Sequence, residues 1–201
     1  MQHSPLIEKY LSTLQALQVS KQATMLDLAC GHGRNGLYLV ENNVAVTFAD
    51  VNGEALEEVE QSLKQFSTEK QKIAQCWHVD FELENFAQEN FAEENIEFEN
   101  TKPLHGKHFA AVMVFRYLHR PLFEQIKAAI VPGGMIIYET FTEQQAQFGR
   151  PKNPDFLLKP TELEGLFADW EILHSFEGVV NTTQHNNTQQ AIAQIVAIKP
   201  D

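Results

Sequence analysis

The sequence predicts an α/β fold built on a mostly parallel sheet, and three observations support this prediction. Short apolar runs that suit buried strands alternate with segments whose apolar residues recur at helical spacing. The chain has 201 residues, 43% of them hydrophobic, which suits a single globular domain. The last two predicted strands are joined without a helix, which indicates an antiparallel hairpin at one edge of the sheet.

The elements follow one another in a regular order. Ser4-Pro5 and leucines at helical spacing predict a first helix over 5–18. Apolar, β-branched runs predict strands over 24–29, 44–49, 73–79, 109–115, 135–138, 170–176 and 191–198. Further helices are predicted over 35–42, after a cap at Asn52, from Pro121, and after a cap at Thr161. Residues 141–159 and 181–190 are polar and are predicted as loops.

One segment in the middle of the chain departs from this alternation. Residues 81–100 contain seven glutamates and four phenylalanines, with no proline or glycine. We interpret about 81–105 as an acidic insertion within a single domain that spans 1–201. Such a charged segment fits a solvated decoration, and it also fits a lid over a binding cleft.

Charge and composition exclude several classes of function. The net charge is −12, so the surface repels phosphate backbones and anionic membranes, and we expect no nucleic-acid or membrane partner. The two cysteines, Cys30 and Cys76, lie far apart, and no metal-ligand pattern is present. No apolar run approaches the length of a membrane span, and the N-terminus does not resemble a signal peptide. We therefore expect a cytoplasmic protein, and the sequence leaves its oligomeric state open.

The strongest chemical signal lies where the first strand turns into a helix. The segment from Asp27 to Gly36 reads DLACGHGRNG and contains a G-x-G-x-x-G pattern that starts at Gly31. Glycines at such a turn let a ligand approach the backbone, and the helix start offers free N–H groups. Asp50 ends the second strand about 20 residues further on, as in nucleotide-binding motifs.

Two ligands fit this motif, NAD and S-adenosylmethionine (SAM), and Asp27 favours SAM. NAD would place a pyrophosphate at the turn, where a carboxylate repels it. SAM carries an ammonium and a sulfonium, which a carboxylate attracts. Asp50 fits both ligands because each offers a ribose diol. Asp27 could instead cap the turn, and Asp50 could cap the following helix.

These residues resemble motif I of the class I SAM-dependent methyltransferases, in the form Asp27-x-x-Cys30-Gly31-x-Gly33. The resemblance covers nearly the whole chain and includes Pro132-Gly133-Gly134. Within the class, the chain is most similar to small single-domain methyltransferases associated with tellurite resistance. The resemblance implies a Rossmann-like seven-stranded sheet in the order 3-2-1-4-5-7-6, with strand 7 antiparallel and helices on both faces. The cofactor-binding residues that it implies are Asp27, Ala29, Cys30, Gly31, Gly33, Asn35, Asp50, Val51, Asp80, Phe81 and Phe115, with S-adenosylhomocysteine (SAH) as the product.

The acceptor site is expected past the fourth and fifth strands. The segment from Phe115 to Pro121 lacks the Asn/Asp-Pro-Pro-aromatic motif of amine-directed nucleic-acid methyltransferases. His119 is the candidate general base, because histidine titrates near neutral pH, although it could simply bond a helix start. Tyr117 could contact the methionine part of SAM or pack in the core. Arg116 completes the candidate catalytic set.

Basic residues gather in the segments expected at this edge of the sheet. Arginine binds planar anions through paired hydrogen bonds, so we predict a small polar or anionic acceptor, such as a carboxylate or oxyanion. Arg116 and Arg120 could alternatively pair with Glu139, Glu143 or the acidic insertion. The predicted substrate-binding residues are Arg120, Arg150, Lys152 and Tyr138.

The sequence therefore favours a SAM-dependent methyltransferase acting on a small molecule. One rival hypothesis is an NAD-dependent oxidoreductase, although no Tyr-x-x-x-Lys pair or similar hydride-transfer site stands out. The other is a non-catalytic SAM-binding regulator, in which the acidic insertion would dock a protein. The attacking atom of the acceptor stays open, because oxygen, nitrogen, sulfur, carbon and a metalloid oxyanion all fit.

Overall fold

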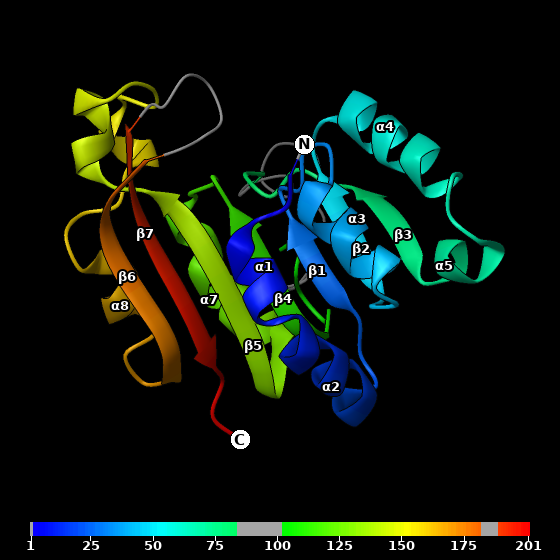
Figure 1. The fold of residues 1–201 in the computed structure, drawn as a ribbon. Helices are drawn as coiled ribbons and strands as arrows, with labels where there is room; N and C mark the ends of the chain where they lie inside the picture. Colours follow the sequence, from blue (N-terminus) through cyan, green and yellow to red (C-terminus); the bar gives the residue numbers. More distant parts are fainter. Residues whose placement is uncertain (1, 84–101, 182–188) are drawn as a thin grey trace, which may run out of the picture.

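The sheet holds seven strands in the order β3-β2-β1-β4-β5-β7-β6 (Figure 1). The computed structural model describes residues 2–83, 102–181 and 189–201. Neighbouring strands are parallel except where β7 pairs with β5 and with β6. The predicted strand order and the reversed strand are thereby confirmed. The strands are β1 Met25–Leu28, β2 Val46–Asp50, β3 Ala74–His78, β4 Phe109–Phe115, β5 Ile130–Phe141, β6 Glu171–Asn181 and β7 Gln189–Ile198.

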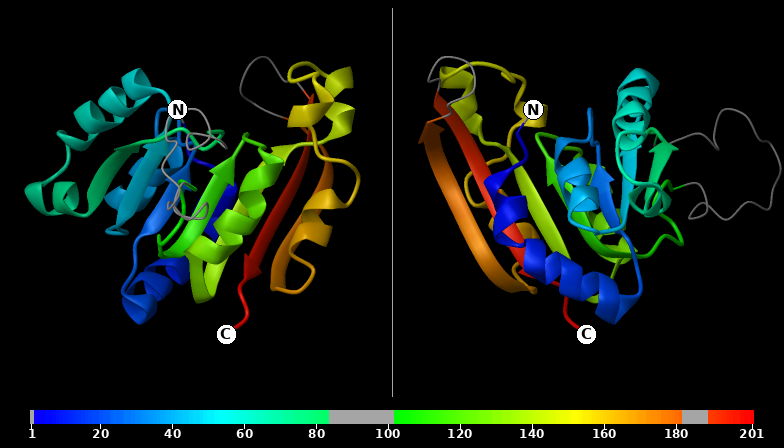
Figure 2. Two further views of the ribbon diagram at one scale, coloured as in Figure 1. Left: turned by 180° about the vertical axis from the view of Figure 1, so that it is seen from behind. Right: turned by 45° about the vertical axis from the view of Figure 1, so that its right-hand side comes forward.

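Helices cover both faces of the sheet (Figure 2). Apolar residues of the first four helices form one buried core with the sheet, and α7 and α8 form a second core on the opposite face. The helices are α1 Pro5–Lys9, α2 Leu11–Lys21, α3 Arg34–Glu41, α4 Gly53–Leu63, α5 Thr68–Lys72, α7 Phe123–Ala129 and α8 Glu162–Leu166, with 3-10 turns η2 Arg120–Leu122, η3 Glu143–Gln147 and η4 Pro154–Phe156. No helix in the described ranges has the length and apolar character needed to cross a membrane.

The strand period of two assigns each side chain to one of these cores. On β1, Met25 packs with the helices α1 to α4, whereas Leu26 and Leu28 belong to the α7–α8 core. Asp27 therefore faces the same side as Met25, toward α3. The same alternation along β5 separates Tyr138, on the α7 side, from Glu139.

The first helix differs from the prediction. Instead of one helix over 5–18, the chain forms α1 and α2, which meet at Tyr10 with φ −103° and ψ 10°. The Tyr10 ring is buried, and its hydroxyl donates to the Leu173 carbonyl on β6 at 3.4 Å. This anchoring coincides with the break in the helix. The predicted cap is confirmed, because the Ser4 side chain accepts from the Leu6 N–H.

One further boundary and one predicted capping contact differ from the structure. β5 begins at Ile130 rather than 135, because Pro132-Gly133-Gly134 lies inside the strand, where the Gly133 N–H donates to the Lys199 carbonyl. Thr161 precedes α8 but its side chain makes no capping hydrogen bond. Its backbone is left-handed, with φ 61°, and its N–H donates to Glu177.

The predicted acidic insertion, about 81–105, and the loop over 181–190 lie largely outside the described residues. At the edges of these ranges, Leu104 is buried in the α7–α8 core. Asn181, Gln189 and Gln190 extend β6 and β7 into the predicted loop.

Candidate functional site

The strand order reverses between β1 and β4, and sheets of this type bind their ligands at the carboxyl ends of the strands beside such a switch point. Each of the two strands is followed by a left-handed residue other than glycine: Ala29 has φ 51° and Arg116 has φ 62°. Such backbone costs energy and gathers at functional sites, so an observed outlier motivates a functional hypothesis. The switch point is therefore the candidate site.

The glycine loop, residues 29–33, follows β1, and every second residue in it has a left-handed backbone. Ala29, Gly31 and Gly33 all have positive φ. A Cβ built on Gly31 meets no atom within 4 Å, whereas one on Gly33 would lie 2.7 Å from the Val59 side chain. Gly33 therefore permits close packing against α4, and Gly31 leaves open space that a ligand can enter.

Asp50 ties the end of β2 to this loop. One carboxylate oxygen accepts from the Gly31 N–H at 2.7 Å, and the other accepts from the Asn52 N–H at 2.8 Å. Each oxygen retains a further lone pair for a ligand hydroxyl. Asn52 caps α4 through Ala55, as its sequence position predicted. Val51, beside Asp50, is exposed.

Asp27 is buried beneath the loop rather than exposed above it. Its Oδ2 accepts from the Gly36 N–H in α3 at 2.9 Å. Burial raises the pKa of this carboxyl from 3.8 to about 7, and the Gly36 hydrogen bond partly opposes the rise. The role of a cap, which the sequence left open, is therefore present, and because Asp27 is only 3% exposed its charge can act on a ligand only through electrostatics.

Residues that follow β3 and β4 lie close enough to influence one another and Asp50. Asp80 accepts from the Glu82 N–H at 2.8 Å, and the Phe81 ring is buried, packed edge-on against Trp77. The Tyr117 hydroxyl is buried and lies within hydrogen-bonding reach of the Glu82 side chain. Burial and then the charge of Glu82 raise its pKa, with smaller effects from Asp80 and Asp50. Tyr117 thus lies near the predicted adenosine residues.

Three other residues predicted to bind the cofactor make contacts within the protein itself. Asn35 is buried, and its Oδ1 accepts from the Ser4 N–H at 2.8 Å, which ties the N-terminal segment to α3. Burial strongly raises the pKa of the half-buried Cys30 thiol, so it is neutral. Phe115 packs against the core that contains α1 to α4.

Arg116 reaches from the end of β4 to β5. Its Nη2 forms an ion pair with Glu139 at 3.1 Å, and its guanidinium lies over the Phe141 ring at 4.5 Å. The predicted alternative, pairing with Glu139, is therefore what the structure shows. Burial lowers the pKa of the Arg116 guanidinium, and the charge of Glu139 opposes this.

Arg120 and Tyr138 were predicted to bind substrate, and both are engaged by the protein itself. Arg120 pairs through two nitrogens with Glu162, at 2.6 and 2.9 Å, and also donates to the carbonyls of Asp155 and Leu157. Tyr138 is 1% exposed, and its hydroxyl donates to the Tyr117 carbonyl at 2.9 Å. Strand alternation turns Tyr138 toward α7, so its hydroxyl is used within the protein, and substrate binding by Arg120 and Tyr138 stays a prediction.

The remaining predicted residues lie in loops. Arg150 and Lys152 are exposed, in the long connection after β5 that contains the cis Arg150-Pro151 bond. Gln145 holds this connection, because it donates to the Arg150 carbonyl and accepts from the Ala191 N–H. His119 is half-buried directly before η2.

Sequence reasoning named Glu139 as a possible partner of Arg116 but missed Gln194 on β7 and His174 on β6, which extend this contact. Glu139 is 5% exposed, and Gln194 and His174 continue its hydrogen bonds. The signal was a glutamate inside the apolar run of β5, because a buried charge requires a partner.

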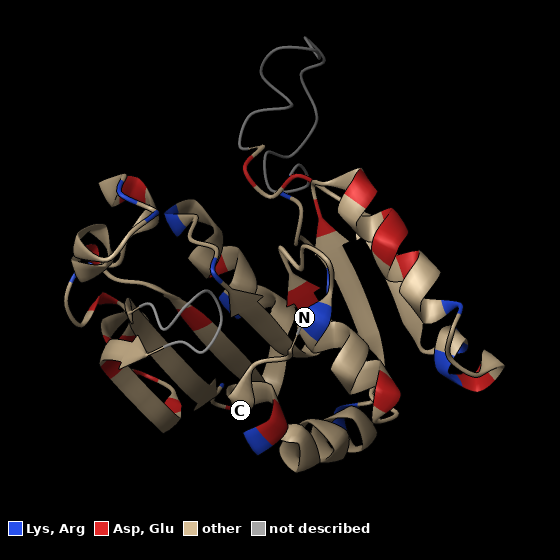
Figure 3. Cartoon of the chain, turned by 45° about the horizontal axis from the view of Figure 1, so that its top comes forward, with Lys and Arg blue, Asp and Glu red and all other residues tan. Residues whose placement is uncertain are grey.

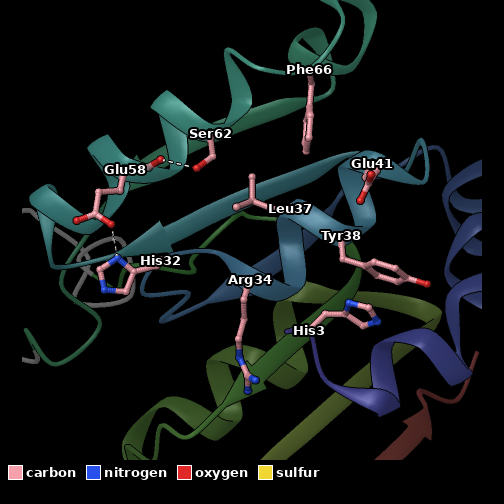
Figure 4. A pocket seen from close by; sticks show the side chains of 9 residues that line it. All are labelled: His3, His32, Arg34, Leu37, Tyr38, Glu41, Glu58, Ser62 and Phe66. Carbon is pink, nitrogen blue, oxygen red and sulfur yellow. Dashed lines mark hydrogen bonds and ion pairs between the residues drawn. The ribbon is translucent and has the colours of Figure 1, made fainter. Parts of the chain in front are cut away.

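A cavity of about 370 Å³ lies between α3 and α4, beside the glycine loop (Figure 4). His32 pairs with Glu58 at 2.9 Å at one end, and His3 stacks on Tyr38 at the other. Neither Gly31 nor Asp50 lines it, so this cavity is distinct from the candidate site at the switch point.

Comparison with known proteins gives a consistent result. The model of the family described as tellurite resistance protein TehB matches residues 5–195. The crystal structure of TehB from Haemophilus influenzae is 18% identical, with TM-score 0.67, over 94% of this chain and 61% of that chain, so this chain spans about three fifths of that protein. A SAM-dependent methyltransferase from Methanosarcina mazei is 16% identical, with TM-score 0.61, over 100% and 99%. The glycopeptide N-methyltransferase MtfA complexed with SAM is 13% identical, with TM-score 0.56, over 94% of each chain. No curated protein sequence matches the chain significantly.

At these identities the solved structures establish the fold, and the family model establishes the relationship. The seven-stranded sheet with its reversed strand belongs to a fold that this chain shares with a SAM-dependent methyltransferase over nearly the full length of both chains. The family model spans nearly all of the described elements, from α1 to β7. The chain therefore belongs to the TehB family, a methyltransferase family.

Proposed function

We propose that this chain binds SAM at the switch point and transfers its methyl group to a small polar or anionic acceptor. The observation that carries this proposal is the glycine loop, where Gly31 faces open space and donates its N–H to Asp50. A ligand that approaches Gly31 meets the Asp50 carboxylate, which has lone pairs for both ribose hydroxyls. MtfA, which shares the fold, was crystallised with SAM.

The charges around the loop favour SAM over NAD. Asp27 and Asp50 lie below and beside the loop, and Asp80 and Glu82 follow β3. A pyrophosphate would be repelled by these carboxylates, whereas an ammonium and a sulfonium are attracted. The acidic side chains that run along α4 extend this negative potential (Figure 3).

Asp80 is proposed to face the adenine, with Val51 and Tyr117 closing the adenosine pocket. The buried Phe81 contributes by supporting Asp80 through its packing on Trp77. Ala29, Cys30 and Gly33 shape the loop through their backbone, and Phe115 and Asn35 fix the elements on either side of it.

Methyl transfer is a displacement in which the acceptor's lone pair forms a bond to the methyl carbon while the carbon–sulfur bond breaks, leaving SAH. The sulfonium is already a good leaving group, so positioning supplies much of the rate. Where the attacking atom carries a proton, we propose that His119 accepts it. Arg116 and the exposed Arg150 and Lys152 are proposed to orient the acceptor.

Calorimetric titration with SAM, with NAD as the control ligand, tests the cofactor assignment. We expect saturable SAM binding and no response to NAD, and the reverse would favour the oxidoreductase hypothesis. Formation of SAH is then measured with a panel of small anions, including tellurite because of the family's description. SAM binding without turnover on any acceptor would favour the regulatory hypothesis.

A further inference from the structure

Four polar side chains form one hydrogen-bonded chain across half of the sheet. Arg116, after β4, pairs with Glu139 on β5 at 3.1 Å. Gln194 on β7 donates to the second oxygen of Glu139 at 2.5 Å, and its own carbonyl oxygen lies 3.0 Å from Nε2 of His174 on β6. Consecutive neighbours in the sheet thus contribute one residue each.

The amide of Gln194 links the two ends of this chain of contacts. Its carbonyl oxygen accepts from His174, and its NH₂ group donates to Glu139. Glu139 thus has one oxygen paired with Arg116 and the other bonded to Gln194. Its side chain is 7% exposed, and a charge so deeply buried is stabilised only by partners such as these. The chain of contacts therefore holds an anion in place beside Arg116.

Three separate contacts and constraints hold Arg116 in one conformation. Its N–H donates to the Glu139 carbonyl at 2.8 Å, its guanidinium lies on Phe141, and its backbone is left-handed. Glu139 and Phe141 are two residues apart on β5, so they face the same side and fix the guanidinium from two directions. Strain of this kind persists where the surroundings over-determine a conformation, as they do at binding sites.

One donor of this guanidinium is left over. Nη1 is buried, and no hydrogen-bond partner for it exists in the described part of the chain. A buried donor without a partner loses the hydrogen bonds that it makes to water in the unfolded chain, so it is unfavourable until a partner arrives. The side chain as a whole is 29% exposed, so a ligand can reach the guanidinium, and Nη1 gains a partner when the guanidinium shifts toward that ligand. The charge of Arg34, at the start of α3, also acts on Arg116, which adds to the attraction for an anion.

We propose that Arg116 is the carboxylate-binding group of the acceptor site, and that Glu139, Gln194 and His174 are the residues that position it. The acceptor class is accordingly a small carboxylic acid, held through its carboxylate with its methyl-accepting atom toward the glycine loop. This inference rests on the proposed methyl transfer and narrows its acceptor. It also explains why Glu139, Gln194 and His174, which lie outside the glycine motif, are bonded to one another: they position Arg116.

The test uses the full chain saturated with SAH and three probe pairs: acetate, benzoate and phenylacetate, each against its amide. Binding is measured by calorimetry, so that no knowledge of the true acceptor is needed. We expect at least one carboxylate to bind about tenfold more tightly than its amide. Arg116→Met abolishes this preference, and Glu139→Gln lowers carboxylate affinity about three- to tenfold while the Kd for SAH stays within about twofold. Glu171→Gln, an exposed glutamate on β6, is the matched control and leaves both affinities unchanged.

Two further variants distinguish positioning from general damage. Glu139→Gln should add nothing to Arg116→Met, because both act on one interaction. The exchange Glu139→Gln with Gln194→Glu should restore part of the carboxylate affinity, since an amide at 139 can accept from Arg116 and donate to a carboxylate at 194. Equal affinity for carboxylates and amides in the unmodified chain, or no rescue by the exchange, would overturn the inference.

The cofactor also carries a carboxylate, and a comparison of ligands separates the two sources. If Arg116→Met weakens SAH binding but not 5′-methylthioadenosine binding, Arg116 holds the cofactor and the acceptor assignment is wrong. Failure of the proposed function itself looks different, because the unmodified chain would then bind neither SAM nor SAH.

Discussion

Replacing Asp27 with asparagine should stabilise the protein above pH 7 and weaken its affinity for SAM. Asp27 is 3% exposed, its carboxyl accepts a hydrogen bond from the Gly36 N–H, and burial raises its pKa from 3.8 to about 7. The amide oxygen of asparagine can accept the same hydrogen bond. The substitution therefore removes the charge and keeps the contact.

The size and sign of the effect follow from the raised pKa. Each pKa unit corresponds to about 1.4 kcal/mol, so ionising Asp27 in the folded protein costs about 4 kcal/mol at pH 8. The folded state binds more protons than the unfolded state between about pH 4 and pH 7. The stability of the unmodified chain therefore falls as the pH rises through this window and levels off above it. Because burying an amide also costs free energy, we expect a net gain of about 2 kcal/mol for Asp27→Asn at pH 8.

Urea unfolding of both proteins at pH 5 and pH 8 measures this effect. The difference in unfolding free energy should be near zero or slightly unfavourable at pH 5, where Asp27 is largely protonated, and should favour Asp27→Asn at pH 8. Asp169→Asn, an exposed aspartate, is the control, because its carboxylate stays solvated on folding. A difference that is the same at both pH values would refute the burial argument.

The cost of burying Asp27 has a functional counterpart. If the charge of Asp27 attracts the cations of SAM, ligand binding favours the ionised carboxylate. As the pH rises toward 7, the Kd for SAM should therefore fall by up to about tenfold per pH unit. Asp27→Asn should remove this dependence and weaken binding at pH 8. A pH profile for SAM shared by both proteins would show that Asp27 acts only as a cap.

The remaining predictions concern single contacts. Asp50→Ala should weaken SAM binding by about 1–3 kcal/mol in calorimetry, and unchanged affinity would exclude the ribose role. In Gly31→Ala the new methyl group meets no atoms, but the residue must keep a φ of +53°, which strains an L-amino acid. We expect a loss of about 1–2 kcal/mol of unfolding free energy in urea and a loss of about tenfold or more in SAM affinity. Gly36→Ala would clash with core side chains and should mainly lower stability. Arg120→Met should lower the Tm by several degrees and leave the Kd for SAM unchanged; a selective loss of ligand binding would return Arg120 to the site. Arg150→Ala should impair acceptor use in the SAH assay with SAM affinity spared, and loss of SAM binding would place Arg150 in the cofactor site or the fold.

Local sequence determined the framework of this protein. A fully apolar run predicted the buried strand 109–115, which the structure reproduces as Phe109–Phe115, and a capping residue before a helical pattern predicted the cap at Asn52. The resemblance in the glycine motif then supplied the strand order. These features depend on neighbouring residues or on a motif, so they are readable before any long-range contact is known. Strand ends were less well predicted, because β5 to β7 continue through Gly133 and Asn181 by pairing with distant strands.

The assignment of polar side chains depended on tertiary structure. Arg116 and Arg120 are close in sequence and were predicted to act together, yet one reaches Glu139 and the other Glu162. A strand alternates its faces and a turn redirects the chain, so residues a few positions apart can meet different neighbours. The sequence alone determined which chemical groups stand at the carboxyl edge of the sheet. Only the folded structure decided which of them the protein uses to hold itself together and which have donors left for a ligand, because hydrogen-bond partners come from strands far apart in the chain.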